Sequence, residues 1–256
     1  GFLSGDVLFL FLPKHPELFI ALLGALKLQL IVSVLFPNIG EEAIRERLED
    51  SHATGIVTCP LYLRKLAAAS KGLPKQRIFL AGDAATTLPE GILSFDELLA
   101  DQAETPFSVA ISPPETPSLL HYTSGSTGRP KGVLHTHGGI LHQHATTTDI
   151  LGLTTADRYW CTADQGWITG TTYGVIGPWS AGVTVLHYEG GYNAEQWLTI
   201  LEREQVTTWY TAPTALRMLM REPPELFRGH SLETLRTIFS VGEPLNPELI
   251  AWPRDM

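Results

Sequence analysis

The segment from Leu119 to Val133 concentrates the residue types that bind phosphate. It reads LLHYTSGSTGRPKGV, so an apolar run leads into glycines and hydroxyl side chains before a lysine. Small residues let the backbone approach an anion closely, and their N–H groups can converge on it. The hydroxyls can donate hydrogen bonds to phosphate oxygens, and the ammonium of Lys131 adds a compact positive charge. The residues expected to contact phosphate are Thr123, Ser124, Gly125, Ser126, Thr127, Gly128 and Lys131.

Two known phosphate-binding motifs do not fit this segment. Pro130 stands where a Walker loop has glycine, and Gly132 follows Lys131 where that loop has serine or threonine. The segment also lacks the G-x-G-x-x-G pattern of dinucleotide-binding folds. A surface hairpin without a ligand is the alternative, because runs of Ser, Thr and Gly often form only turns. The hydroxyls, the glycines and the Pro-Lys-Gly ending together favour phosphate binding.

The segment Tyr122–Gly132 resembles the phosphate loop of the adenylate-forming enzymes, a superfamily that includes acyl-CoA synthetases, luciferases and the adenylation domains of peptide synthetases. Three further segments are similar to the AMP-forming acetyl-CoA synthetase family, namely Tyr159–Gly170, Trp209–Arg217 and Ser240–Pro247. The resemblance extends over nearly the whole chain and is loosest across Ala81–Pro117.

The resemblance implies a reaction in two steps. A carboxylate, acetate first among the candidates, would attack the α-phosphorus of ATP and give an acyl-adenylate and pyrophosphate. The thiol of coenzyme A would then take the acyl group and release AMP. Mg²⁺ would bridge phosphate oxygens, and Lys131 and Thr127 would act on the phosphates. Because an anion must approach a polyanion, positioning and electrostatic stabilisation should dominate catalysis.

A turn after the predicted strand Leu235–Ser240 carries Gly242, Glu243 and Pro244. On sequence alone it is only a strand-end turn. By resemblance, its backbone would pack against the adenine ring, which agrees with the gathering of ligands beyond the carboxyl ends of strands in α/β folds. Glu243 needs no role as a general base, because a carboxylic acid substrate is already ionised at neutral pH.

Four residues resemble the acyl pocket of the family. From sequence alone, Trp167 would be a core or core-edge residue. By resemblance it would wall the pocket and limit the length of the acid, with Val241 as a second wall. Ile168 would lie beside the pocket, and Thr169 near the pantetheine arm of coenzyme A. One methylene in such a pocket changes binding by about 1–3 kcal/mol, so a preference for acetate over propionate would be relative.

Four histidines, His135, His137, His142 and His144, raise the question of a metal site. No carboxylate or cysteine completes a ligand spacing with them, and the helix predicted after the phosphate loop spreads three of them over more than one face. No metal is therefore expected there. Asn193 is expected to cap a helix, and the resemblance would also allow a coenzyme A contact at this residue.

Composition limits the class of protein. Lys plus Arg total 18 against 27 for Asp plus Glu in 256 residues, which gives a formal net charge of −9. Without a basic face to offset this charge, nucleic-acid binding is not expected, and the predicted partners are small molecules. The two cysteines are far apart and match neither a disulfide framework nor a zinc site, which favours buried thiols in the cytoplasm. No charged leader precedes an apolar core, so no signal peptide is predicted.

The most apolar stretch, Leu18–Phe36, is almost long enough to span a bilayer. Lys27 and Gln29 lie near its middle, however. A buried helix (Pro16–Leu28) followed by a buried strand (Ile31–Phe36) is therefore preferred, and no membrane contact is expected.

Short apolar runs alternate with segments of helical period, which predicts an α/β fold with mainly parallel sheets flanked by helices. The resemblance implies two packed sheets of this kind, part of the N-terminal domain of an adenylate-forming enzyme. Asn38 with Glu41, and Asn193 with Gln196, have the spacing of capping boxes at helix starts. Further predicted helices are Ser94–Ala100 and His137–Leu151. The predicted strands are Val7–Leu12, Ile31–Phe36, Gly55–Thr58, Arg77–Leu80, Ser118–Tyr122, Arg158–Thr162, Val183–Tyr188, Val206–Thr211 and Leu235–Ser240.

The stretch Ala81–Pro117, rich in Ala, Thr, Pro and acidic residues, is interpreted as a surface connection. It would end a first α/β subdomain, residues 1–117, and a second subdomain, residues 118–256, would hold the phosphate loop and the acyl and adenine walls. The family also has a small C-terminal domain with the catalytic lysine of adenylation, which the sequence up to Met256 does not contain. The chain alone is therefore expected to have little ligase activity. Two alternatives stay open: a ligase for a propionyl, medium-chain or aryl acid, and a non-catalytic nucleotide-binding module.

Overall fold

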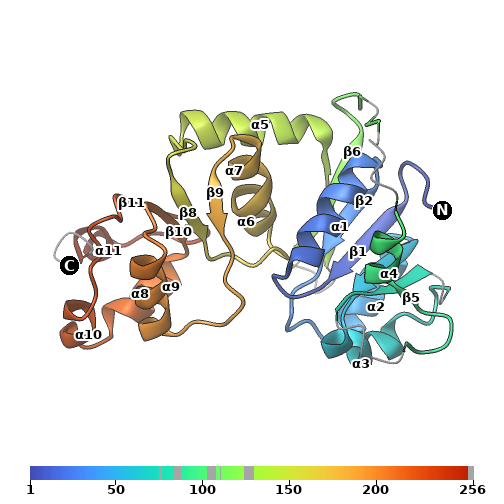
Figure 1. Ribbon diagram of the computed structural model, residues 1–256, viewed down its shortest axis with the longest axis horizontal. Coiled ribbons are helices and arrows are strands. Elements are labelled where there is room, and N and C mark those ends of the chain that lie inside the picture. The colour runs from blue at the N-terminus through green and yellow to red at the C-terminus, as the bar shows by residue number, and fades with distance from the viewer. Residues whose placement is uncertain (75–76, 83–87, 103–107, 110, 124–129, 253–256) are drawn as a thin grey trace. The chain divides into compact units, whose positions relative to one another are not determined.

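The computed structural model describes residues 1–74, 77–82, 88–102, 108–109, 111–123 and 130–252. The chain forms two compact units, Gly1–Gly139 and Ile140–Met256 (Figure 1). Each unit contains one sheet, built mainly or wholly from parallel strands, together with helices. The predicted α/β class is confirmed.

The first unit has a seven-stranded sheet in the order β5-β4-β3-β1-β2-β6-β7. All neighbours are parallel except β6 and β7, which form an antiparallel hairpin. The central strand β1 is an apolar run buried along its whole length, as expected for a strand covered on both faces. The strands are β1 (Val7–Phe11), β2 (Ile31–Val34), β3 (Gly55–Thr58), β4 (Ile78–Leu80), β5 (Leu93–Ser94), β6 (Pro117–Thr123) and β7 (Lys131–Thr136). The helices are α1 (Pro16–Lys27), α2 (Glu41–Asp50), α3 (Pro60–Ala69) and α4 (Phe95–Ala100).

The long apolar stretch divides as predicted. Helix α1 ends at Lys27, the chain turns at Gln29 with a φ of 58°, and β2 begins at Ile31. Figure 1 shows α1 alongside β1 and β2, which it contacts. Within the part of the chain that the structure describes, every helix is too short or too polar to cross a bilayer.

One of the two predicted capping boxes is confirmed and the other is wrong. Asn193 caps α8 (Ala194–Arg203), since its side chain accepts a hydrogen bond of 2.9 Å from the Gln196 N–H. Helix α2 instead begins at Glu41 with Gly40 in the N-cap position, and no side chain caps it. Asn38 therefore lies two residues before the N-cap, too far back along the chain to satisfy the first free N–H groups of the helix.

The second unit has a four-stranded, all-parallel sheet in the order β11-β10-β8-β9. Its strands are β8 (Arg158–Cys161), β9 (Thr184–Leu186), β10 (Thr208–Thr211) and β11 (Thr237–Ser240). Helix α5 (His137–Asp149) begins in the first unit and continues into the second. The other helices are α6 (Ile168–Thr171), the π-helical turn η2 (Thr172–Ile176), α7 (Gly177–Ser180), α8 (Ala194–Arg203), α9 (Pro213–Met220), α10 (Pro224–Arg228) and α11 (Pro247–Ala251).

Alternating side chains of β8 and β10 build a core on each face of this sheet. On one face Trp160 stacks on Trp209 with ring centroids 6.0 Å apart, and Trp197 of α8 meets Trp160 edge to face at 5.3 Å. On the other face Tyr159 and Tyr210 belong to a separate apolar cluster. Successive side chains of a strand point to opposite faces of a sheet. Burial of both sets is typical of a sheet that is covered by helices on each side.

Asp157 ties together the amino ends of three strands in the second sheet. Its carboxylate accepts hydrogen bonds from the Thr154 N–H at 2.9 Å, from the Thr207 hydroxyl at 2.8 Å and from the Arg236 guanidinium at 2.6 Å. These donors stand just before or beside the starts of β8, β10 and β11. Burial by itself would raise the pKa of Asp157, but the hydrogen bonds and the charge of Arg236 outweigh it and hold the pKa below its ordinary value.

All nine predicted strands are present, and the structure adds β5 and β7. Both added strands belong to the first sheet. The stretch interpreted as a surface connection thus supplies β5 and α4 to the first unit. The hairpin of β6 and β7 is also part of that sheet, because β6 pairs with β2, so the division between the units falls after Gly139 rather than after Pro117.

Candidate functional site

The hairpin of β6 and β7 forms the stem of the predicted phosphate loop. In its register Thr123 lies opposite Lys131, and Tyr122 lies opposite Gly132. A Cβ on Gly132 would come within 3.1 Å of the Leu120 side chain, so the small residue suits the close packing of the stem. The predicted contacts Ser124, Gly125, Ser126, Thr127 and Gly128 lie outside the described residues. The stem therefore brings the first and last predicted phosphate contacts to the same end of the hairpin.

Tyr122 anchors this stem to α2. Its hydroxyl donates a hydrogen bond of 2.8 Å to the Asp50 carboxylate, and the Arg47 guanidinium lies 5.3 Å from the centre of its ring. Burial, followed by the hydrogen bond to Asp50, raises the pKa of Tyr122 well above its ordinary value. Tyr122 is therefore a neutral donor at every physiological pH.

The histidines are distributed over three elements. His121 in β6 and His135 in β7 meet edge to face with ring centroids 5.5 Å apart. Burial, together with the neighbouring His135, lowers the pKa of His121 to about 4, so this side chain is neutral at pH 7. His144 of α5 bonds to the Ser180 hydroxyl at 2.9 Å. In the described ranges, no three His, Cys, Asp or Glu side chains are grouped so that they could hold a metal ion.

In the second unit, the carboxyl ends of β8, β10 and β11 meet at one edge of the sheet because the strands are parallel. Thr162 follows β8 and Thr211 is the last residue of β10, and their hydroxyl groups lie 2.7 Å apart. The N–H of Val241, just after β11, donates to the carbonyl of Thr211 at 3.3 Å. This edge is where α/β folds place their ligands.

A tightly bonded loop leads from this edge to Trp167. The Trp167 N–H donates to the Asp164 carbonyl at 3.0 Å, and the Thr171 hydroxyl donates to the Gln165 carbonyl at 2.6 Å. A Cβ on Gly170 would collide with the Asp164 carbonyl, so the loop and α6 touch through glycine. These contacts fix Trp167 at the N-cap of α6 although 56% of its surface is exposed.

The Val241–Pro244 turn follows β11. Gly242 has a φ of 95°, a conformation that favours glycine. Thr214 and Arg217 of α9 donate hydrogen bonds to the Glu243 carboxylate, the shorter contacts measuring 2.6 and 2.7 Å. These bonds, Thr214 first, lower the pKa of Glu243, so the carboxylate is ionised at neutral pH.

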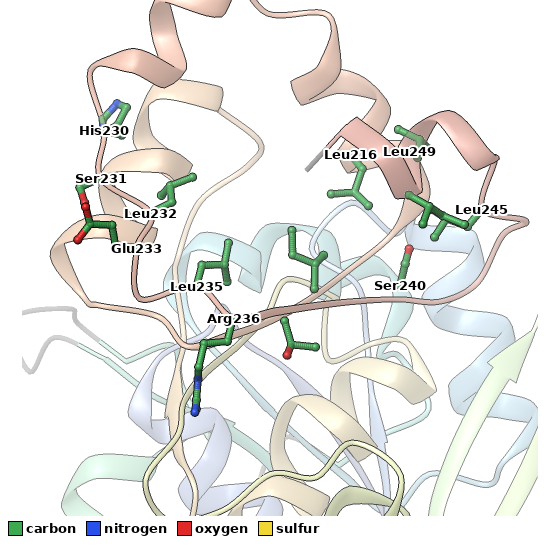
Figure 2. A pocket seen from close by; sticks show the side chains of 13 residues that line it. Leu216, His230, Ser231, Leu232, Glu233, Leu235, Arg236, Ser240, Leu245 and Leu249 are labelled. Atoms are coloured by element: carbon green, nitrogen blue, oxygen red, sulfur yellow. The ribbon is translucent and has the colours of Figure 1, made fainter. Parts of the chain in front are cut away.

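A cavity of about 750 Å³ lies beside β11 (Figure 2). Side chains of β11, α9, α11 and the segment 230–235 line it, and Ser240 and Leu245 on its wall flank the Val241–Pro244 turn. The buried hydroxyl oxygen of Ser240 has no hydrogen-bond partner among the described residues. The volume lies within the usual range for small-molecule sites, about 300–1,000 Å³.

The predicted site residues thus fall into two groups. Thr123 and Lys131 lie at the stem in the first unit. The residues predicted to contact the acid, the adenine or coenzyme A lie beyond the carboxyl ends of strands in the second unit, and they are Trp167, Ile168, Thr169, Val241, Gly242, Glu243 and Pro244. Thr214 and Arg217, which bind Glu243, are not among the predicted contacts. Thr214 and Arg217 are three residues apart on one helix, so the sequence could have predicted that they lie on the same helix face.

Comparison with known proteins places this arrangement in a family. The family model of AMP-binding enzymes matches residues 1–256. The acetyl-coenzyme A synthetases of Bacillus subtilis and Pyrobaculum aerophilum are 43% and 38% identical over 97% and 98% of this chain. The matches cover 43% and 40% of those proteins, so the chain spans about two fifths of the length of these curated relatives.

Solved structures give the same result. The acyl-CoA synthetase of Brucella canis superposes with a TM-score of 0.90 at 36% identity, covering 98% of this chain and 45% of that one. The anthranilate CoA ligase AuaEII in complex with anthranoyl-AMP superposes with a TM-score of 0.88 at 27% identity, covering 99% and 49%. The resemblance seen in the phosphate-loop segment is confirmed. Since the family match runs from the first residue to the last, the chain belongs to the AMP-binding enzymes.

Proposed function

We propose that the protein joins a short carboxylic acid, acetate by preference, to coenzyme A at the expense of ATP. A carboxylate oxygen attacks the α-phosphorus, the bond from that phosphorus to the bridging oxygen of the β-phosphate breaks, and pyrophosphate leaves. The coenzyme A thiol then loses its proton to solvent, its sulfur bonds to the acyl carbon, the bond from that carbon to the phosphate oxygen of AMP breaks, and AMP leaves. The observation that carries the proposal is the 43% identity to an acetyl-coenzyme A synthetase across 97% of the chain.

The loop on the stem of β6 and β7 holds the β- and γ-phosphates in this proposal. Lys131, exposed at the stem, and Thr127 stabilise charge on the departing pyrophosphate. The loop sequence from Thr123 to Lys131 contains hydroxyls and no carboxylate. It fits a polyphosphate rather than a bare cation, so Mg²⁺ would be held mainly through substrate phosphate oxygens, where it neutralises negative charge.

The carboxyl edge of the second sheet receives the adenine and the acid. The backbone of Gly242, Glu243 and Pro244 packs against the adenine. The Ser240 hydroxyl, which has no hydrogen-bond partner in the described part of the chain, lines the cavity next to this turn. Val241, Ile168 and Trp167 wall the acyl group, and Thr169 faces the pantetheine arm of coenzyme A. The two cysteines are both buried, which suits an enzyme of the reducing cytoplasm.

The function is tested first by binding. Isothermal titration of the 256-residue chain with ATP and Mg²⁺, with AMP and with tripolyphosphate should show binding of all three. Lys131→Ala should weaken tripolyphosphate binding, because it removes the charge at the stem, whereas Lys71→Ala in the same unit should not. Absence of binding for every ligand would overturn the assignment of a nucleotide site.

The chemistry is tested in a chimera. Residues 1–256 replace the matching segment of the Bacillus subtilis acetyl-coenzyme A synthetase, to which they are 43% identical. The chimera should exchange pyrophosphate into ATP when acetate is present, and less well with propionate, butyrate or anthranilate. Exchange with a larger acid but not with acetate would identify a different ligase. A chimera that binds ATP and exchanges with no acid would favour a non-catalytic nucleotide-binding module.

The size of the acyl pocket can be tested in the same chimera. Val241→Ala should raise the rate with propionate relative to acetate by about tenfold, since one methylene is worth about 1–3 kcal/mol. Trp167→Gly should extend the range to longer acids if the indole is a wall of the pocket. If the Trp167→Gly protein keeps its preference for acetate, Trp167 is not a wall of the pocket. That result would not affect the role proposed for Val241.

A further inference from the structure

Two side chains of α9 hold the turn that follows β11. The Thr214 hydroxyl lies 2.6 and 2.8 Å from the two carboxylate oxygens of Glu243. Arg217 donates from one guanidinium nitrogen to the Glu243 carboxylate at 2.7 Å and from the other to the Pro244 carbonyl at 3.2 Å. Side chain and main chain of the turn are therefore both bound by one helix.

The helix that supplies these donors is itself fixed in the core. Leu216 and Leu219 of α9 are 2% and 1% exposed and pack in the cluster around Trp160 and Trp209. Thr214 and Arg217 stand three residues apart on the same helix and also contact each other at 3.4 Å. A rigid element thus carries the donors, and the turn with its left-handed Gly242 carries the acceptors.

We infer that Arg217 and Thr214 are positioning residues, which hold the Gly242–Pro244 turn in the shape that receives the adenine ring. The inference rests on the proposed function, because that function assigns the adenine to this turn. Arg217 binds a carboxylate and a carbonyl with two separate nitrogens, and a lysine ammonium at the same place could not reproduce this fork. Holding the backbone of Pro244 in advance saves the ordering that would otherwise accompany nucleotide binding.

If Arg217 served only the stability of the fold, its removal would lower the thermal unfolding midpoint. The side chains of Arg217 and Glu243 are 35% and 39% exposed, and ion pairs of this kind contribute little to folding stability. Removing Arg217 should therefore leave the thermal unfolding of the protein almost unchanged. The effect should appear in the binding of ligands that carry adenine and not in the binding of phosphate chains.

The test is calorimetric titration of the 256-residue chain with AMP and, separately, with tripolyphosphate. Arg217→Ala should raise the Kd for AMP by about tenfold, the cost of ordering the turn at binding, and leave the Kd for tripolyphosphate unchanged. Thr214→Val should act in the same direction, Thr214→Ser should bind as the parent does, and Arg217→Lys should recover only part of the loss. Arg228→Ala is the matched control, because it removes an exposed arginine that pairs with Glu225 in the same unit.

A second measurement needs no ligand. Hydrogen–deuterium exchange of the backbone amides from Gly242 to Leu245 should be faster in Arg217→Ala than in the parent, with exchange in β8 and β10 unchanged. Parent-like AMP binding by Arg217→Ala, or an equal loss of AMP and tripolyphosphate binding, would overturn the inference. A parent chain that binds neither AMP nor tripolyphosphate would refute the proposed function, and the exchange rates would then decide alone whether α9 holds the turn.

Discussion

At Gly170 the fold accepts only hydrogen as a side chain. A Cβ there would meet the backbone of Asp164 and Gln165, which cannot swing aside as the tip of a long side chain can. We expect Gly170→Ala to lower the free energy of unfolding of the second unit by about 1–3 kcal/mol, the usual cost of overpacking. Urea denaturation followed by tryptophan fluorescence measures this change.

Gly191→Ala is the matched control in the same unit, since a Cβ at that position has open space around it. It should change the free energy of unfolding by less than about 0.5 kcal/mol. Equal stabilities of the two alanine variants would contradict the close contact between α6 and the loop before it.

At this scale the sequence predicts contiguous motifs better than pairs. The hydroxyls, glycines and lysine of the predicted phosphate loop are neighbours in the chain, so phosphate binding can be predicted from them without knowledge of the fold. Arg217 and Glu243 are 26 residues apart, and only the parallel packing of β10 beside β11 brings them together. The exposure of Trp167 is equally a property of the fold, because tryptophan at a strand-to-helix corner is more often part of a core.

Among the elements, the amino ends of the strands in the second sheet are held by one buried carboxylate, whereas the carboxyl ends are where we propose that ligands bind. Asp157 binds donors at the amino ends of three strands. We expect Asp157→Ala to destabilise the second unit by about 1–3 kcal/mol, because three donors lose the buried carboxylate that accepts their hydrogen bonds. Thermal unfolding should show the loss, while Glu225→Ala, which breaks an exposed ion pair, should change the midpoint little.

The same carboxylate gives the sheet a pH dependence. The folded pKa of Asp157 lies below its ordinary value near 3.9, so its contribution is complete above about pH 5 and is lost as the pH falls below 4. The loss between pH 5 and pH 3 should be smaller in Asp157→Asn, whose amide does not titrate. Identical acid transitions in parent and variant would mean that other carboxylates control unfolding.

The two strands that were not predicted from the sequence, β5 and β7, show no regular alternation of apolar and polar residues. β7 is exposed along most of its length, so its apolar residues do not alternate with the sheet face. β5 has two residues, too few for any period. The nine predicted strands are short runs in which apolar, β-branched or aromatic residues predominate, and three of them, β1, β3 and β10, are buried along their whole length, which is why they could be predicted. The false start at Asn38 shows that capping spacing alone does not fix where a helix begins.

On the scale of the whole molecule, each of the two units has its own sheet and its own buried core. We expect calorimetry to resolve two unfolding transitions that respond differently to pH. His121 in the first unit has a folded pKa of about 4, below the ordinary value of 6.5, so its stabilisation is complete above pH 7 and declines as the pH falls from 6.5 towards 4. The decline amounts to at most about 3 kcal/mol.

Lowering the pH from 7 to 5 should therefore reduce the midpoint temperature of the first unit's transition more than that of the second unit's transition. His121→Gln should remove most of the pH response of the first unit, and Asp157→Ala should lower the midpoint temperature of the second unit. A single transition that both variants shift equally would show that the two units unfold as one cooperative body.

The pairing of Thr123 with Lys131 has a geometric corollary. The register holds Thr123 and Lys131 at a fixed separation, so the number of residues between them decides whether this last pair of the stem can form. We therefore expect an insertion or a deletion between Thr123 and Lys131 to weaken ATP binding more than an exchange of one small residue for another.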